Sequence, residues 1–78
     1  MSKKKSAPFL REIGSHIRNC REERRIPRKS FAHSLQISPQ QLSNIENGNI
    51  NDIGIVRIAE IAHILSIDFL EIVRMFKK

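Results

Sequence analysis

The chain lacks tryptophan and tyrosine and has a single cysteine, Cys20, among its 78 residues. One cysteine excludes an intramolecular disulfide framework and is typical of a protein of the reducing cytosol. Long hydrophobic runs are missing too, because Arg57, Glu60 and His63 interrupt the most apolar stretch, residues 53–67, which cannot span a bilayer. We therefore expect one small cytoplasmic domain without a membrane segment.

Groups that could carry catalysis or hold a metal are scarce. His16 and Cys20 lie four residues apart on an expected helix, but two ligands do not make a metal site, and an exposed histidine beside a half-buried cysteine is the simpler interpretation. Glu22 and Glu23 stand beside two arginines, with no hydrophobic pocket of the kind a general acid needs. We expect no catalytic residue, no metal and no cofactor, and hence a protein that is not an enzyme.

Positive charge is concentrated in the first half of the chain. Residues 1–36 hold ten Lys or Arg and three acidic residues, a balance of +7, whereas residues 37–78 have a balance of −1. The net charge of +6 points to an anionic partner such as double-stranded DNA. A basic surface that is merely solvated remains the alternative at this point.

Apolar residues recur at spacings of three and four, which predicts helices rather than strands. The breaks between helices fall at Pro27, at Ser38 with Pro39, and at residues 47–49, while Asp52 and Asp68 are expected to cap the last two helices. These signals predict a compact all-α fold of five helices without internal repeats, over residues 9–24, 28–35, 39–46, from 52 and from 68 to about 76. We expect a flexible basic arm at residues 1–8 and one DNA-binding and dimerisation domain at residues 9–78.

The last two expected helices have more apolar residues than one core face can use. In the fourth helix we assign one face to the core: Ile55, Ile58, Ala59, Ala62 and Leu65. The remaining apolar side chains suggest a self-complementary patch and hence a twofold homodimer. The residues predicted to form this interface are Ile53, Val56, Ile64, Leu70 and Phe76.

The second and third helices are joined by so few residues that they must cross steeply, as in a helix-turn-helix. On the third helix Leu42 and Ile45 face inward, so Gln40, Gln41 and Asn44 fall together on the outward side. Each of these amides carries a donor beside an acceptor, which matches the N6 and N7 edge of adenine in the major groove. This pattern indicates sequence reading rather than simple attraction to phosphate.

The chain resembles the lambda-repressor-like, or XRE-type, helix-turn-helix family of transcription regulators. The resemblance covers residues 13–73 and includes Ile13-Gly14 in the first helix, the signature from Arg28 to Asn47, and the run SNIENG. Two positions depart from the family pattern, because Gln36 and Arg25 stand where glycine is usual, and a side chain in a left-handed conformation costs about 1 kcal/mol.

The resemblance implies roles for individual residues. It makes Gln40, Gln41, Asn44 and Ser43 base readers. It makes Arg28, Lys29, Ser38, Asn47 and Asn49 phosphate contacts. It also implies a partly buried structural ion pair between Arg21 and Glu46.

These observations together predict a homodimeric transcription regulator, of the repressor type, that reads a palindromic operator through the major groove. An antitoxin-type regulator that also binds a partner protein is one alternative. A nonspecific nucleic-acid binder is another, although it would favour Lys and Arg over amides on the outward face.

Overall fold

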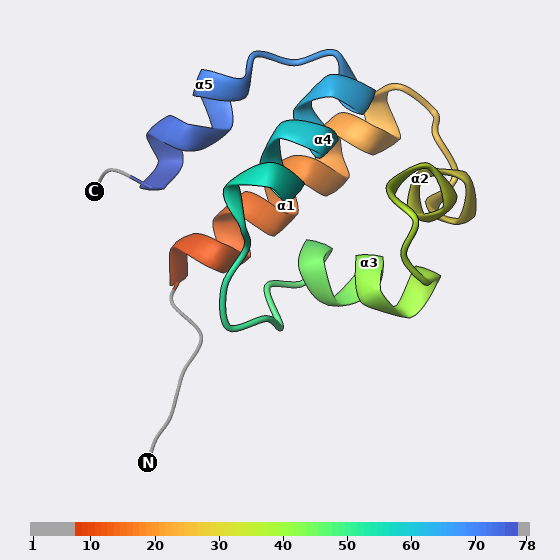
Figure 1. Ribbon diagram of the computed structural model, residues 1–78, viewed down its shortest axis with the longest axis horizontal. Helices are drawn as coiled ribbons and strands as arrows, with labels where there is room; N and C mark the ends of the chain where they lie inside the picture. The colour runs from red at the N-terminus through yellow and green to blue at the C-terminus, as the bar shows by residue number, and fades with distance from the viewer. Residues whose placement is uncertain (1–7, 77–78) are drawn as a thin grey trace.

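The computed structural model describes residues 8–76, which form five α-helices and one final turn of 3₁₀-helix (Figure 1). No strand occurs in this range, so the all-α prediction is confirmed. The elements are α1 Pro8–Glu23, α2 Arg28–Leu35, α3 Pro39–Glu46, α4 Ile55–Leu65, α5 Phe69–Val73 and η1 Arg74–Phe76. Residues 1–7 of the predicted arm lie outside the described residues, and Pro8, also assigned to the arm, instead begins α1.

The helices surround one apolar core to which all five contribute. α1 and α4 lie side by side at the centre, α3 packs against α1 and α2, and α5 packs against α4 (Figure 1). The largest fully buried apolar side chains are Ile13, Ile17, Phe31, Leu42, Ile58, Ile61, Leu65 and Ile72. Buried side chains recur at helical spacing along α1, α3 and α4, so each of these helices has one face in the core and an opposite face accessible to solvent.

The prediction for the fourth helix was wrong in its start and in its buried face. Gly54 is the N-cap, whereas the Asp52 carboxylate accepts a hydrogen bond from the backbone of Ile53 at 2.8 Å. Ile53, expected in the dimer interface, is only 8% exposed and belongs to the core. Ile55 and Ala59, expected in the core, are exposed, and α4 buries Ile58, Ile61, Ala62 and Leu65 instead.

The turns after α2 and α4 have the same backbone. Gln36 (φ 60°, ψ 40°) and Ser66 (φ 57°, ψ 42°) adopt the left-handed conformation, and the next residue, isoleucine in both turns, donates to the carbonyl of the alanine five residues earlier at 3.0 Å. Residues 32–38 (AHSLQIS) and 62–68 (AHILSID) are identical at four of seven positions. The two turns thus share a backbone conformation and part of their sequence.

Arg25 also adopts the left-handed conformation, with φ 57°. Gln36 and Arg25, at the two positions where glycine is usual, thus both adopt the left-handed conformation that glycine favours, although each carries a side chain.

Gly14 sets the distance between α1 and α3. A Cβ atom at this position would come within 2.6 Å of the carbonyl oxygen of Glu46, closer than real Cβ contacts allow. The backbone of α1 at Gly14 therefore contacts the backbone at the C-terminal end of α3, so that end of α3 packs against the middle of α1.

Candidate nucleic-acid interface

α3 begins with a complete capping box. The Ser38 hydroxyl accepts a hydrogen bond from the Gln41 backbone N–H at 3.0 Å, and the Gln41 Oε1 accepts one from the Ser38 backbone N–H at 2.8 Å. Pro39 occupies the first helical position, where its missing N–H costs nothing. The cap fixes the start of a helix of only eight residues, which would be marginal in isolation.

The capping box limits what Gln41 can offer to a base. Its Oε1 already accepts from the Ser38 backbone N–H, which leaves one lone pair on that oxygen and both Nε2 amide hydrogens. Gln41 can therefore donate to O6 or N7 of guanine, N7 of adenine or O4 of thymine, whereas the capping box holds its oxygen toward the Ser38 backbone. The sequence-based view of Gln41 as equivalent to Gln40 missed this difference.

Other polar side chains of α3 and of its C-cap are hydrogen-bonded in pairs, each pair one helical turn apart. Gln40 Nε2 donates to Asn44 Oδ1 at 3.2 Å, and Asn47 Nδ2 donates to Ser43 Oγ at 3.3 Å. In the first pair the Gln40 carbonyl oxygen can still accept a hydrogen bond and the Asn44 amide hydrogens can still donate one. The bond between the two side chains holds this acceptor and this donor in position. Such prior ordering lowers the side-chain entropy that would be lost on binding.

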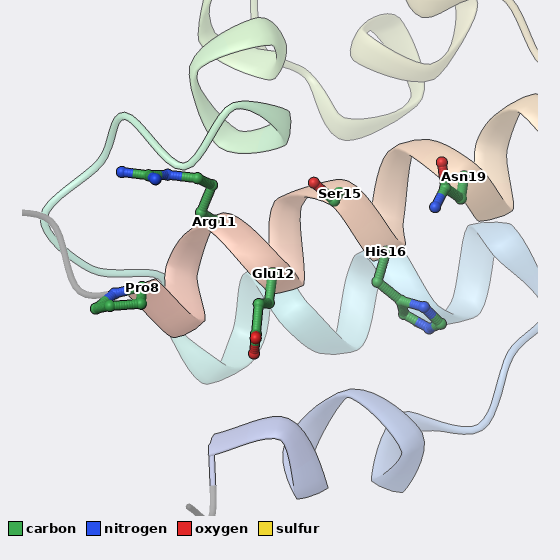
Figure 2. Close-up of a pocket in the computed structure, with 6 residues that line it drawn as sticks. All are labelled: Pro8, Arg11, Glu12, Ser15, His16 and Asn19. Atoms are coloured by element: carbon green, nitrogen blue, oxygen red, sulfur yellow. The ribbon is translucent and has the colours of Figure 1, made fainter.

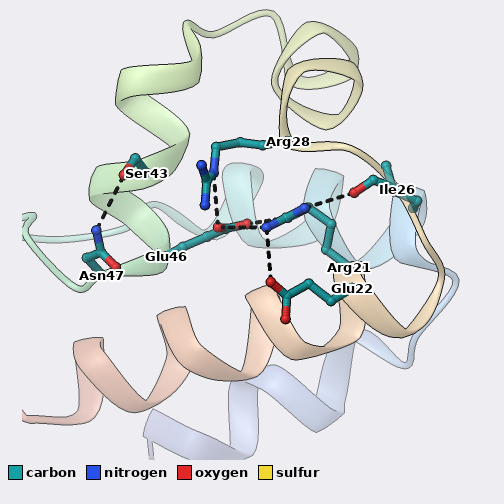
Figure 3. A network of polar contacts seen from close by, with 7 residues as sticks. All are labelled: Arg21, Glu22, Ile26, Arg28, Ser43, Glu46 and Asn47. Atoms are coloured by element: carbon teal, nitrogen blue, oxygen red, sulfur yellow. Dashed lines mark hydrogen bonds and ion pairs between the residues drawn. The ribbon is translucent and has the colours of Figure 1, made fainter.

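A buried ion pair anchors the far end of α3 to α1. Arg21 Nε donates to Glu46 Oε2 at 2.7 Å, and Arg21 Nη2 donates to Glu46 Oε1 at 3.2 Å, while both side chains are nearly inaccessible to solvent. Arg21 Nη1 also donates to the carbonyl of Ile26 at 2.8 Å (Figure 3). The structure thus brings together the two residues expected to pair, and the fork geometry satisfies a charge that would otherwise be costly to bury.

Arg28 reaches the same carboxylate from α2. Its Nε lies 3.7 Å from Glu46 Oε1, and its side chain is about half exposed (Figure 3). Glu46 therefore holds Arg28 beside the end of α3 while most of the guanidinium remains accessible. Lys29, Ser38, Asn47 and Asn49 are also exposed, and the Asn49 backbone N–H donates to the carbonyl of Asn44 at 2.8 Å.

Two cations near this surface were not singled out from the sequence. Arg57 of α4 lines a shallow hollow together with Gln41 and Asn44, and its Nη1 donates to the carbonyl of Leu35 at 3.1 Å and to Glu60 at 2.9 Å. Arg11 of α1 lies against Gly48, whose Cβ position would be 2.6 Å from the Arg11 Cα, and its side chain extends toward the α3–α4 loop (Figure 2). The Arg57–Glu60 pair is three residues apart on one helix, but the contacts of Arg57 with Leu35 and of Arg11 with Gly48 join segments distant in sequence, and no spacing could have indicated those two.

The predicted dimer residues lie in different environments. Val56 is 69% exposed and Leu70 51% exposed, Ile64 is half-buried against the core, and Ile53 is buried. Ile55, at 60% exposure, joins the exposed apolar surface instead. The side chain of Phe76 lies outside the described residues. The accessible apolar residues are thus Ile55 and Val56 on α4 and Leu70 on α5.

Other features of the described surface are less specific. A second open hollow runs along α1 and is lined by residues from that helix alone: Pro8, Arg11, Glu12, Ser15, His16 and Asn19 (Figure 2). Within residues 8–76 no helix has the length and apolar character needed to cross a membrane.

The comparisons with known proteins agree with this architecture. The helix-turn-helix family model matches residues 17–72, and the chain belongs to this family, which is the XRE-type, lambda-repressor-like class of DNA-binding transcription regulators rather than a class of enzymes. No curated protein matches the chain by sequence.

Two kinds of solved structure share the fold. The clp gene regulator ClgR from Corynebacterium glutamicum is similar with a TM-score of 0.78 and 19% identity, over 88% of this chain and 88% of that chain. The restriction-modification controller protein C.AhdI from Aeromonas hydrophila is similar with a TM-score of 0.72 and 21% identity, over 81% of this chain and 90% of that chain. At these identities the likeness establishes the fold.

Proposed function

We propose that this DNA-binding regulator reads a specific sequence through α3 and binds a palindromic operator as a homodimer. The observation that carries the proposal is the row of uncharged amides on α3, a helix that is capped at one end and held to α1 by a buried ion pair at the other. Side chains that read bases must be positioned to within a fraction of an ångström, and this double attachment supplies such positioning.

Gln40 and Asn44 would read an adenine as a unit. The Gln40 carbonyl oxygen can accept from adenine N6, and the Asn44 amide can donate to N7, while the bond between the two side chains stays intact. Gln41, whose oxygen is held toward Ser38, would use its amide hydrogens and favour a neighbouring base that presents an acceptor. Ser43 and its partner Asn47 would lie at the edge of this contact.

The phosphate contacts would flank the reading helix. Arg28 and Lys29 at the start of α2, Ser38 at the cap, and Asn47 with Asn49 after α3 are exposed polar or charged groups around it. Arg11 extends this set to α1, because it lies against the loop after α3. Phosphate contacts fix register without reading sequence, so this set and the amides should respond differently to mutation.

A binding experiment with matched variants tests the reading role. The preferred site is first selected from random duplexes, and affinities for that site and for random DNA are then measured at several salt concentrations. Gln40→Ala and Asn44→Ala should each cost about 1–3 kcal/mol on the selected site and leave random DNA nearly unchanged. Arg28→Ala should weaken both duplexes alike and lower the salt slope by about one unit.

His63→Ala, an exposed position on α4, serves as the control and should change neither affinity. If Gln40→Ala weakened selected and random DNA equally, the amides would not read sequence, and nonspecific binding would replace the proposal.

The homodimer would form through α4 and α5. Ile55, Val56 and Leu70 are exposed apolar side chains on two helices that contact each other, and a paired copy would remove them from water. One small reading head seldom reaches useful specificity, whereas a twofold pair doubles the contacts.

Sedimentation of Val56→Lys and Leu70→Lys tests this interface against His63→Lys, an exposed polar position near the C-terminal end of α4. The two apolar positions should give a larger dimer dissociation constant and weaker operator binding, and the control should give neither. A wild-type chain that sediments as a monomer at high micromolar concentration, free and on DNA, would overturn the dimer.

A further inference from the structure

Three side chains capable of binding a metal converge between α1 and α5. His16 Nε2 lies 2.8 Å from Glu71 Oε2 and 3.7 Å from Cys20 Sγ, and the nearest ligand atoms of all three residues lie within 4.8 Å of one another. His16 and Cys20 are one helical turn apart on α1, so they share a face. Glu71 comes from α5, toward which His16 projects (Figure 2).

We propose that His16, Cys20 and Glu71 form a Zn²⁺ site that ties α5 to α1. The sequence excluded a metal because His16 and Cys20 supply only two ligands, and the third comes from a helix about fifty residues further along the chain. No ligand spacing in the sequence could have indicated it.

The three ligand atoms need to move by only about an ångström to surround a tetrahedral ion. Bonds of about 2.0 Å to nitrogen and oxygen and about 2.3 Å to sulfur place tetrahedral ligand atoms roughly 3.3–3.6 Å apart. The histidine–cysteine separation of 3.7 Å is within about 0.1 Å of this range, and the ligand atoms of all three residues lie within 4.8 Å of one another, so binding would draw the widest pair together. The histidine–glutamate contact is a hydrogen bond of 2.8 Å, and it would open by about half an ångström as each atom turns to the ion.

The donor set favours Zn²⁺ among the common ions. One sulfur, one imidazole nitrogen and one carboxylate oxygen are all ligands that zinc accepts, whereas Mg²⁺ and Ca²⁺ prefer oxygen alone. Thiolate and carboxylate together neutralise the two charges of the ion. Glu71 is about half exposed, so water can complete the fourth position from the solvent side.

Metal binding at this site must release a proton from Cys20. Burial raises the pKa of the Cys20 thiol, Glu71 and Glu23 raise it further, and Arg24 opposes them. The thiol of the free protein is therefore protonated near neutral pH, and coordination replaces its proton by the ion.

The structural consequence concerns the smallest helix. α5 has five residues, and its polar link to α1 is the exposed contact between His16 and Glu71. An ion shared by three ligands would hold α5 in place far more firmly than that hydrogen bond. The inference does not depend on DNA binding.

Cobalt(II) provides the probe. The full, untagged chain is treated with a chelator, reduced, and titrated with Co²⁺. We expect one ion per chain, visible bands of tetrahedral intensity, a thiolate-to-cobalt charge-transfer band, and bleaching of these bands by Zn²⁺. Zn²⁺ should also raise the Tm of the metal-free protein.

Variants assign the ligands. Cys20→Ala should abolish the charge-transfer band, and His16→Gln and Glu71→Gln should each weaken Co²⁺ binding by at least about 10- to 100-fold, since even partners of metal ligands have effects of this size. The side chains of His16 and Glu71 are partly exposed, so His16→Gln and Glu71→Gln should remain folded. His63→Gln, on α4, is the control and should bind Co²⁺ like the wild type.

Three results would overturn the site: a weak octahedral spectrum without charge transfer, unchanged binding in both His16→Gln and Glu71→Gln, or one ion per two chains. The last would mean that Cys20 binds metal between molecules.

Discussion

The turns after α2 and α4 have the same backbone conformation and share four of seven residues. The helices that follow them differ, because α3 exposes polar side chains and α5 exposes an apolar one. The first turn ends at Ser38 and introduces α3, with its outward amides. The second ends at Asp68 and introduces α5, whose sequence FLEIV exposes Leu70. A turn of this kind therefore determines where the chain changes direction, and the residues after the cap determine what the new helix offers.

The two helices also differ in how they are attached to α1. Each extends an acidic side chain back to it: Glu46 of α3 pairs with Arg21, and Glu71 of α5 pairs with His16. Glu46 is 2% exposed and bonded to two guanidinium nitrogens, whereas Glu71 is about half exposed and has one contact to His16. α3 thus has the stronger attachment.

Removing the two acids should give the largest contrast. Glu46→Ala leaves the Arg21 charge buried without its partner and should lower the free energy of unfolding by about 3–5 kcal/mol. Glu71→Ala, measured with a chelator present, should lower it by less than about 1 kcal/mol, because exposed pairs are screened by solvent. Urea denaturation of both variants checks this, and equal losses would contradict the distinction between the two attachments.

The two caps should differ by less. Ser38→Ala breaks a capping box in which two backbone donors are satisfied, and we expect a loss of about 1–2 kcal/mol. Asp68→Ala removes one hydrogen bond, to the Leu70 backbone at 3.0 Å, and should cost about 0.5–1 kcal/mol. Thermal and urea unfolding of the pair give the comparison; a larger loss at Asp68 would show that the Ser38 hydroxyl contributes less than the Asp68 carboxylate.

The left-handed residues should give the smallest effects, and equal ones. Gln36→Gly and Ser66→Gly relieve the same conformation in the same turn, so each should stabilise the protein by a few tenths to about 1 kcal/mol, with the double variant additive. Ser34→Gly, within α2, is the control and should destabilise it by about 0.5 kcal/mol. Calorimetric Tm values that moved in opposite directions at the two turns would show that they are not equivalent.

The sequence predicted α2 and α3 to the residue, because proline, a serine cap and polar breaks mark their ends. α4 was harder. Apolar residues at positions 53, 55, 56, 58, 61 and 64 fill almost every helical phase, so spacing alone does not select the buried face. Tertiary packing made that choice, burying Ile53 and exposing Ile55.

The candidate site divides in the same way. The outward placement of Gln40, Gln41 and Asn44 follows from helical geometry once Leu42 and Ile45 are known to be apolar. The commitment of the Gln41 oxygen to Ser38, the position of Arg11 beside Gly48, and the meeting of Glu71 with His16 depend on side-chain conformations and on contacts between distant segments.

Gly14 gives α1 a part in positioning α3 that an assay could easily misassign. A methyl group there would push against the carbonyls at the end of α3 and displace that helix. In a genetic screen for lost regulation, substitutions at Gly14 would appear beside those at Gln40 and Asn44 and would look like alterations of a base contact. The temperature dependence of binding distinguishes the two. A substitution at Gly14 should weaken binding to selected and random DNA together as the temperature rises and the fold is destabilised. A substitution at Gln40 or Asn44 should weaken binding to the preferred site alone.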